Sequence, residues 1–216
     1  MSTPEAAISI DRATCDELAR LGTATVYEAN GRTGLLDLDL EQLIPGTRAA
    51  GPARIAACAQ DDNWAVHKVM SVLQPGEVLV LTMPEPAPVA LVGDLLLTQA
   101  KVHGAVGVLV NAATRDVDEV KELGLPVWTR WRRVRGAAKA EPGAVDVPVR
   151  VGEQLIRPGD IVIMDADGAV VVPLDEVPQA LQAARARVQK EAATRERLQT
   201  GELSYDLHGL RAKEAQ

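Results

Sequence analysis

Short apolar runs alternate with helical segments through the middle of the chain, and this alternation restricts the fold more than any other feature. Runs of Val, Leu and Ile bounded by turns are typical of buried strands. They occupy 53–59, 77–83 and 106–111, and the segments 63–73 and 94–103 between them have helical periodicity. Strands that alternate with helices of about ten residues predict α/β units with parallel pairing.

The last third of the chain has a different pattern. Short strands are expected in quick succession at 127–131, 145–151, 160–165 and 169–172. From Leu174 to about Gly201 the pattern is helical again, with one narrow apolar stripe, and a polar tail follows at 202–216. We therefore expect a single α/β domain over 1–216, with a partly antiparallel β layer. The long C-terminal helix packs either on another subunit or on its own sheet, and both remain open.

Two shorter helical segments, 12–20 and 23–33, are expected before the first strand. Residues 1–14 have neither the basic nor the apolar part of a signal peptide. No apolar run approaches the ~20 residues of a membrane span. We therefore expect a cytoplasmic protein that does not contact a membrane.

Composition excludes several functions. Aromatic residues make up 2% of the chain and Phe is absent, so stacking platforms for bases or sugars are largely excluded. The net charge of −7 argues against a nucleic-acid partner, which needs an excess of Lys and Arg. Cys15 and Cys58 form no metal-binding or redox motif and are expected as buried, reduced thiols.

The candidate site lies in one segment, 93–117. A helix is expected to begin at Asp94, and a strand to end just before Arg115 and Asp116. Open α/β sheets bind ligands at the carboxyl ends of their strands, and free N–H groups at a helix start attract anions. Two carboxylates beside an arginine can hold a hard divalent cation and an anionic substrate together. The alternative is that both Asp residues are ordinary helix N-caps and Arg115 is a surface charge.

This spacing, with twenty residues between Asp94 and Arg115–Asp116, resembles the signature of the class II pyruvate aldolases of the RraA-like superfamily. These are the 4-hydroxy-4-methyl-2-oxoglutarate / 4-carboxy-4-hydroxy-2-oxoadipate aldolases. Further motifs follow the family's order over about 20–205: Asp62-Asn63 with His67, Pro75-Gly76-Glu77, Gly93 to Leu96, Leu125 to Trp128, Val147-Pro148-Val149, Pro158-Gly159-Asp160 and Asp165 to Pro173. Asn111 departs from the pattern, because relatives often carry Asp there.

The resemblance implies a single-domain, layered α/β/β sandwich of the swivelling type with a long C-terminal helix. It also implies that Asp116 binds Mg²⁺ or Mn²⁺ directly and that Asp94 reaches the ion through a water molecule. Arg115 would face the C2 oxygen of pyruvate, while the N–H groups of Leu95 and Leu96 hold the pyruvate carboxylate.

A second subunit is part of this expectation. In the family, a glutamate from the neighbouring subunit's C-terminal helix completes the water shell of the metal, and by register that residue is Glu191. Assembly would then be a trimer or a dimer of trimers. The alternative role for Glu191 is an ion pair with Arg187 or Arg195 one helical turn away, which contributes only ~0.2–0.5 kcal/mol.

The implied reaction is retro-aldol cleavage of a 4-hydroxy-2-oxo di- or tricarboxylic acid to pyruvate and a second oxo acid. The metal would act as a Lewis acid, with a metal-bound water as the base, and oxaloacetate decarboxylation would accompany the cleavage because it forms the same pyruvate enolate. A non-catalytic regulator of ribonuclease E activity shares the fold and is the alternative. Asp116 beside Arg115 favours the enzyme. A methyltransferase is not supported, because the sequence has no Gly-rich nucleotide loop.

Other polar residues are assigned lesser roles. His67 and His103 lie in helical segments and are expected to be structural, while Lys101 and Lys139 are expected at the surface or the rim. The Asp61–Asn63 turn is expected to cap a helix.

A basic segment at 129–139 contains Arg130, Arg132, Arg133, Arg135 and Lys139. As a strand, it would place Arg130 and Arg132 on one face and the next two arginines on the other. It is either a solvated edge strand protected by its charge or a guide that steers a di- or tricarboxylate into the site.

Overall fold

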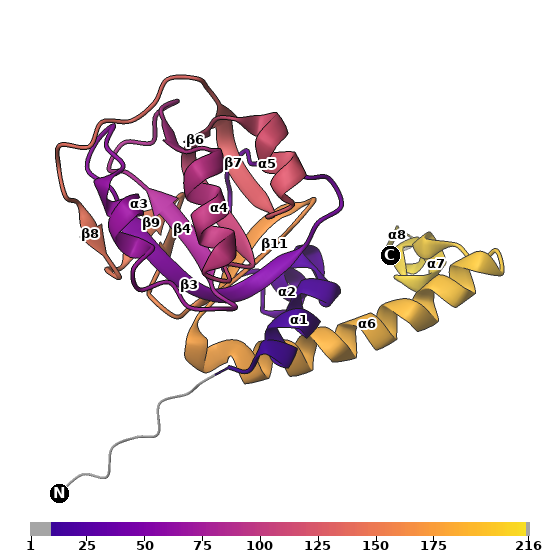
Figure 1. Cartoon of the computed structure of the whole chain (residues 1–216). Coiled ribbons are helices and arrows are strands. Elements are labelled where there is room, and N and C mark those ends of the chain that lie inside the picture. Colours follow the sequence, from indigo (N-terminus) through magenta and orange to yellow (C-terminus); the bar gives the residue numbers. More distant parts are fainter. Residues whose placement is uncertain (1–9, 215–216) are drawn as a thin grey trace, which may run out of the picture.

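Four parallel strands form the centre of the structure, a computed structural model that describes residues 10–214 (Figure 1). In order across the sheet they are β3 (Ala49–Ala57), β4 (Val78–Thr82), β6 (Gly107–Thr114) and β7 (Val127–Arg132). The helices α3 (Trp64–Val69), α4 (Asp94–Val102) and α5 (Val117–Leu123) alternate with them along the chain. The predicted α/β units with parallel pairing are therefore confirmed. The expectation about a signal peptide falls mostly on residues 1–9, outside the described residues.

Antiparallel strands extend the sheet on both sides. On one side β11 (Ile161–Asp165) pairs with β3, β12 (Gly168–Val172) with β11, and β1 (Leu35–Leu36) with β12. On the other side β2 (Glu41–Gln42) pairs with β7. The remaining strands are β5 (Ala90–Val92) along β6, β8 (Ala144–Val145) along β3, and the hairpin of β9 (Val149–Val151) and β10 (Gln154–Ile156). This confirms the partly antiparallel β layer.

Three aliphatic cores separate the layers. The first lies between the parallel strands and α3, α4 and α5, and the second lies between those strands and β9 to β12. The third joins the outer face of β11 and β12 to α1 (Arg12–Leu21), α2 (Thr23–Ala29) and the start of the C-terminal helix. The α/β/β order is as expected, with one more helical layer outside it. Trp128 is the only fully buried aromatic side chain among residues 10–214, and its indole Nε1 donates to the Asp165 carbonyl at 2.7 Å.

The C-terminal helix α6 (Val177–Gln199) packs on its own chain for only half its length. Val177, Ala180, Leu181 and Ala184 are buried against α1, α2 and the sheet, and no residue of α6 after Ala184 is buried. The second half leaves the body and ends beside two short helices, α7 (Ser204–Leu207) and α8 (Leu210–Glu214), in the expected polar tail (Figure 1). No helix among the described residues is long and apolar enough to cross a membrane.

Left-handed turns shorten several predicted elements. The helix expected over 23–33 ends at Ala29, because Gly31 and Arg32 have φ values of 68° and 62°. The strand expected over 145–151 is split after Val145 by Asp146, whose φ is 55°. The helix expected over 63–73 also ends early, at Val69, but there without a left-handed residue, because Met70 is still right-handed.

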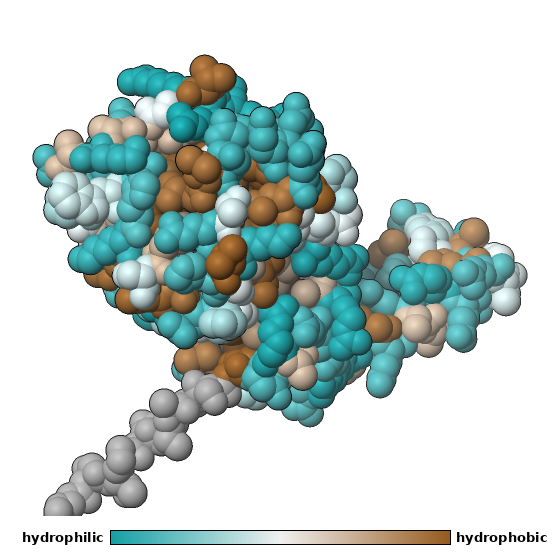
Figure 2. Space-filling view, in the orientation of Figure 1, coloured by the Kyte–Doolittle hydropathy of each residue, from teal (hydrophilic) through white to brown (hydrophobic). Residues whose placement is uncertain are grey.

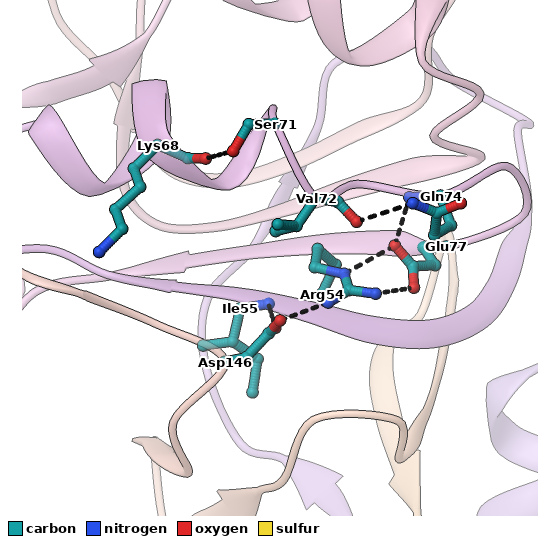
Figure 3. A network of polar contacts seen from close by, with 8 residues as sticks. All are labelled: Arg54, Ile55, Lys68, Ser71, Val72, Gln74, Glu77 and Asp146. Atoms are coloured by element: carbon teal, nitrogen blue, oxygen red, sulfur yellow. Dashed lines mark hydrogen bonds and ion pairs between the residues drawn. The ribbon is translucent and has the colours of Figure 1, made fainter.

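A charged cluster ties three of these elements together (Figure 3). Arg54 on β3 donates to both carboxylate oxygens of Glu77, at 2.8 and 2.6 Å, and it also pairs with Asp146 after β8. Glu77 accepts a further bond from the Gln74 N–H at 2.7 Å, just before β4. The hydrogen bonds to Glu77 are the largest cause of a raised Arg54 pKa, so this guanidinium is held firmly in its charged form.

We expect Arg54→Met to lower the free energy of unfolding in urea. The expected loss is about 2–3 kcal/mol, below that of a fully buried pair because Glu77 and Asp146 are 12% and 30% exposed. Arg185→Met is the matched control, since Arg185 forms a similar pair with Glu17 at the surface and solvent screens that pair. An equal loss in both variants would contradict a special role for the Arg54 cluster.

Candidate functional site

The Arg115–Asp116 pair forms a strained turn at the carboxyl end of β6. Arg115 N–H donates to the Val92 carbonyl at 3.1 Å, which fixes the turn against the end of β5. Asp116 has φ 57° and ψ 45°, the left-handed region that non-glycine residues rarely adopt. It precedes α5, but its side chain makes no capping hydrogen bond. Asp116 is the N-cap residue of α5 by position, but its carboxylate accepts the Asp94 N–H and does not cap that helix.

Gly93 brings the second carboxylate next to this turn. Asp94 N–H donates to Asp116 Oδ2 at 3.2 Å. A Cβ on Gly93 would lie 2.2 Å from that same oxygen and 3.1 Å from Arg115 Cγ, so only glycine permits the approach. Gly93 is also the N-cap of α4, and Asp94 is its first residue. Asp94 is thus not an N-cap, and it lines the site.

A hollow of about 300 Å³ opens beside the two turns. Its lining includes the whole set predicted from one chain: Asp94, Leu95, Leu96, Arg115 and Asp116. The Nε atom of Arg115 lies 3.5 Å from Asp116 Oδ2, and Asn111 is not part of the lining.

Glu191, the remaining predicted residue, is elsewhere in the chain. It lies on the projecting half of α6, where its Oε1 is 2.7 Å from Arg187 Nε. Within one chain it therefore makes the ion pair that was its alternative role.

The start of α4 faces the hollow with free donors. Asp94 N–H is used by Asp116 and Leu97 N–H by the Gly93 carbonyl. The N–H groups of Leu95 and Leu96 have no acceptor within residues 10–214, as expected for the first turn of a helix. A carboxylate in the hollow would satisfy them.

The donor set fits a hard divalent cation. No group of three or more His, Cys, Asp and Glu suited to a metal occurs in the described part of the chain. Asp94 and Asp116 supply two carboxylates at one edge of the hollow. Mg²⁺ characteristically takes one or two carboxylates and keeps several waters, and Mn²⁺ accepts the same oxygen ligands. The residues present therefore fit Mg²⁺ or Mn²⁺.

Comparisons with known proteins assign the chain to a family. The sequence profile of the RraA-like family, described as Aldolase/RraA, matches residues 15–171, which is more than half of the chain. The chain belongs to the RraA-like family. A curated protein of Halalkalibacterium halodurans, provisionally named a 4-hydroxy-4-methyl-2-oxoglutarate aldolase, is 35% identical over 158 residues, covering 73% of this chain and 75% of the relative.

Solved structures of RraA-like proteins have the same fold. An uncharacterised protein from Pseudomonas syringae pv. tomato superposes with a TM-score of 0.79 at 26% identity, covering 94% of this chain and 96% of that one. Streptomyces coelicolor RraAS2 is described as an unusual member of the RNase ES inhibitor RraA protein family. It superposes with a TM-score of 0.76 at 33% identity, and the match covers 86% of this chain and 97% of RraAS2. The predicted family and fold class are both confirmed.

Two residues of this RraA-like chain line the hollow although lesser roles were expected for them from the sequence. His67, expected to be structural, and Lys139, expected at the rim, lie in the same lining as Arg115. Lys139 is exposed, so its rim position is correct, but it faces the hollow. The sequence had marked both only indirectly, His67 as part of a family motif and Lys139 as a member of the basic segment at 129–139.

The loop that carries Lys139 is fixed by a buried aspartate. Asp62, 1% exposed, accepts hydrogen bonds from the N–H groups of Ala140 and Glu141 at 2.6 and 3.1 Å through one oxygen, and from Trp64 N–H at 2.8 Å through the other. Burial raises the pKa of Asp62, but these donors outweigh it, so the pKa lies below its usual value. The predicted capping role of this turn is confirmed, and the same carboxylate also holds the loop.

The other members of the basic segment do not share this hollow. β7 ends at Arg132, so Arg133 and Arg135 lie in the following loop and not on the opposite face of a strand. Arg132 pairs with Glu41 on the short edge strand β2, and Arg130 stacks on Trp131 at 4.5 Å. Arg132 and Arg133 line a separate hollow on the Arg115–Asp116 turn.

The electrostatics of His67 provide a test of this geometry. Partial burial is the largest cause that lowers the pKa of His67 below 6.5, the positive charge of Lys139 is the next, and Asp62 opposes both. We expect Lys139→Met to raise the His67 pKa in an NMR titration of the imidazole C–H signals. Lys101→Met, on α4 and bonded to the Leu123 carbonyl, should leave it unchanged. An unchanged pKa in Lys139→Met would show that Lys139 does not face His67.

Proposed function

We propose that this RraA-like protein is a divalent-metal-dependent pyruvate aldolase. It would cleave 4-hydroxy-2-oxo di- or tricarboxylic acids, such as 4-hydroxy-4-methyl-2-oxoglutarate or 4-carboxy-4-hydroxy-2-oxoadipate, to pyruvate and a second oxo acid. Oxaloacetate decarboxylation is the companion activity. The observation that carries the proposal is that two carboxylates, one guanidinium and the free N–H groups of α4 meet in one hollow.

Asp116 is the direct ligand in this proposal, and Asp94 and Glu191 of the partner subunit act through water. When bound, Mg²⁺ or Mn²⁺ supplies Lewis-acid polarisation of the 2-oxo group. The relative named as an aldolase supports an enzyme of this type.

The chain's own residues bind and orient the substrate. Leu95 and Leu96 N–H groups hold the C1 carboxylate at the positive end of α4. The Arg115 guanidinium places a fixed positive charge at the C2 oxygen, where negative charge develops as the C3–C4 bond breaks. The C4 hydroxyl loses its proton, the electron pair of the broken bond enters the enolate, and a proton returned to C3 gives pyruvate.

A second copy of the chain completes the proposed site. Leu95 and Val134, beside the Arg115–Asp116 turn, are 80% and 91% exposed, which is unusual for apolar side chains at the mouth of a site. Figure 2 shows apolar side chains interrupting the hydrophilic surface on the face that carries α3 and α4. The unsupported half of α6 carries Glu191 and is free to reach a neighbour. These features support contact with a neighbouring copy, and the assembly that we propose is a trimer or a dimer of trimers.

A non-catalytic regulator of ribonuclease E activity is the second candidate. Streptomyces coelicolor RraAS2 favours it, because this chain covers 97% of that protein at 33% identity. Such a regulator acts by protein contact and has no need of a carboxylate in the strained position of Asp116.

We expect the purified protein with Mg²⁺ or Mn²⁺ to release pyruvate from 4-hydroxy-4-methyl-2-oxoglutarate, measured with a coupled lactate dehydrogenase assay, and excess EDTA to abolish the release. Asp116→Ala should lower kcat at least about 100-fold, with an unchanged circular dichroism spectrum. Asp118→Ala, exposed two residues further on, is the control. Full turnover in EDTA, or in Asp116→Ala, would refute the proposed mechanism.

The partner's contribution can be measured by subunit mixing. Asp116→Ala and Glu191→Ala should each be inactive alone. When they are refolded together in equal amounts, about a quarter of the sites in a symmetric oligomer combine an intact Asp116 with an intact Glu191 from a neighbour, so that share of wild-type activity should return. No recovery in mixed oligomers verified by mass spectrometry would place the two residues outside a shared site.

A further inference from the structure

We propose that the wall of the hollow formed by Lys139 and His67 is a subsite for the distal carboxylate of the substrate, and that Lys139 selects dicarboxylic over monocarboxylic 2-oxo acids. This inference rests on the proposed function, whose residues account only for the pyruvate half of the substrate. The C4 side of a dicarboxylic substrate carries a second negative charge, which also needs a partner.

The charges in the hollow identify that partner. Four lining side chains are charged at neutral pH: Asp94, Asp116, Arg115 and Lys139. The two carboxylates repel a substrate anion, and Arg115 already lies 3.5 Å from Asp116 and faces the C2 oxygen in the proposed reaction. Lys139 is therefore the one cation in the lining that remains for a second carboxylate.

Lys139 is also free to bind. Its ammonium group makes no hydrogen bond or ion pair with any residue in the described range 10–214. The nearby Asp62 carboxylate is occupied by the backbone N–H groups of Trp64, Ala140 and Glu141, so it does not neutralise Lys139 through a direct contact. A lysine so close to two carboxylates is expected to form an ion pair with one of them, because opposite charges attract. The unpaired state of Lys139 is therefore unusual.

The loop holds Lys139 at a suitable distance. Gly136 lies against Arg115, because a Cβ there would be 2.8 Å from Arg115 Nη1. Lys139 follows three residues later, so its Cα lies at most about 11 Å from that of Gly136. The carboxylates of an extended five-carbon diacid are about 5 Å apart by standard bond lengths. Lys139 and the first residues of α4 line the same hollow of about 300 Å³, which is large enough for such a diacid between them.

Backbone hydrogen bonds keep this loop in place. Ala137 N–H donates to the Ala90 carbonyl at 3.2 Å, and Ala138 N–H donates to the Asp61 carbonyl at 2.8 Å. The loop is thus tied both to β5 and to the turn before α3. His67 projects from α3 into the same lining and offers a neutral N–H donor beside the lysine.

The experiment uses unreactive analogues of equal length. Binding of 2-oxoglutarate and of 2-oxopentanoate, which lacks the distal carboxylate, is measured by calorimetry with Mg²⁺ on the full-length protein. Wild type should bind the diacid more tightly. Lys139→Met should weaken the binding of 2-oxoglutarate about 10- to 100-fold, as expected for a lost charge-assisted contact. The Kd for 2-oxopentanoate should stay within twofold of the wild-type value. Lys139→Arg should retain most of the preference, and Lys101→Met should bind as wild type does.

A second experiment tests the proposed aldolase function independently of the subsite. It follows the exchange of the pyruvate methyl protons in D₂O by NMR. The wild-type protein with Mg²⁺ should exchange these protons, since the reaction needs only the pyruvate half of the site, and Lys101→Met, outside the hollow, should match its rate. The subsite would be overturned if the wild-type protein bound the two acids with equal affinity. It would also be overturned if Lys139→Met weakened the binding of both acids equally. The wild-type protein could instead discriminate the two acids through Lys139 but neither exchange the pyruvate methyl protons nor cleave substrate. That result would support the subsite and overturn the proposed aldolase activity.

Discussion

The site depends on the close approach of two backbone turns. β5 and β6 run parallel, so their carboxyl ends lie at the same edge of the sheet. Arg115 follows β6 at once, and Asp94 follows β5 after Gly93. Gly93 allows the turns to touch, because any side chain there would overlap the Asp116 carboxylate. The N–H of Asp94 then bonds to that carboxylate, and the start of α4, the guanidinium and both acids face one hollow. Pairing of strands thus determines which charges meet.

Local signals in the sequence were sufficient for the elements that frame this edge. The apolar run before Arg115 and the helical period after Asp94 placed β6 and α4 correctly, and the twenty-residue spacing identified the motif. β5 was missed because it is three residues long and follows a Pro-rich stretch that has no strand period. Its position comes from pairing with β6 and not from its own composition.

Lys139 and His67 could not be found in the same way. Their loop and helix are joined by a bridge between Asp62 and Ala138, more than seventy residues apart in sequence. The family motif around His67 and the basic segment around Lys139 do not show that these two residues meet, and a lone histidine in a helix is more often structural. The path of α6 was equally undetermined, because a narrow apolar stripe fits its own sheet and a neighbour's surface equally well, and the structure uses the stripe only as far as Ala184.

The backbone of Asp116 has a consequence for how such a chain can change. An aspartate held at φ 57° is less stable there than a glycine would be, since the left-handed conformation brings its Cβ close to backbone atoms. Any lineage that ceased to need the carboxylate could exchange it for glycine and gain stability by that single step. That glycine would also remove the oxygen that accepts the Asp94 N–H, so the contact between the two turns is kept at a conformational cost.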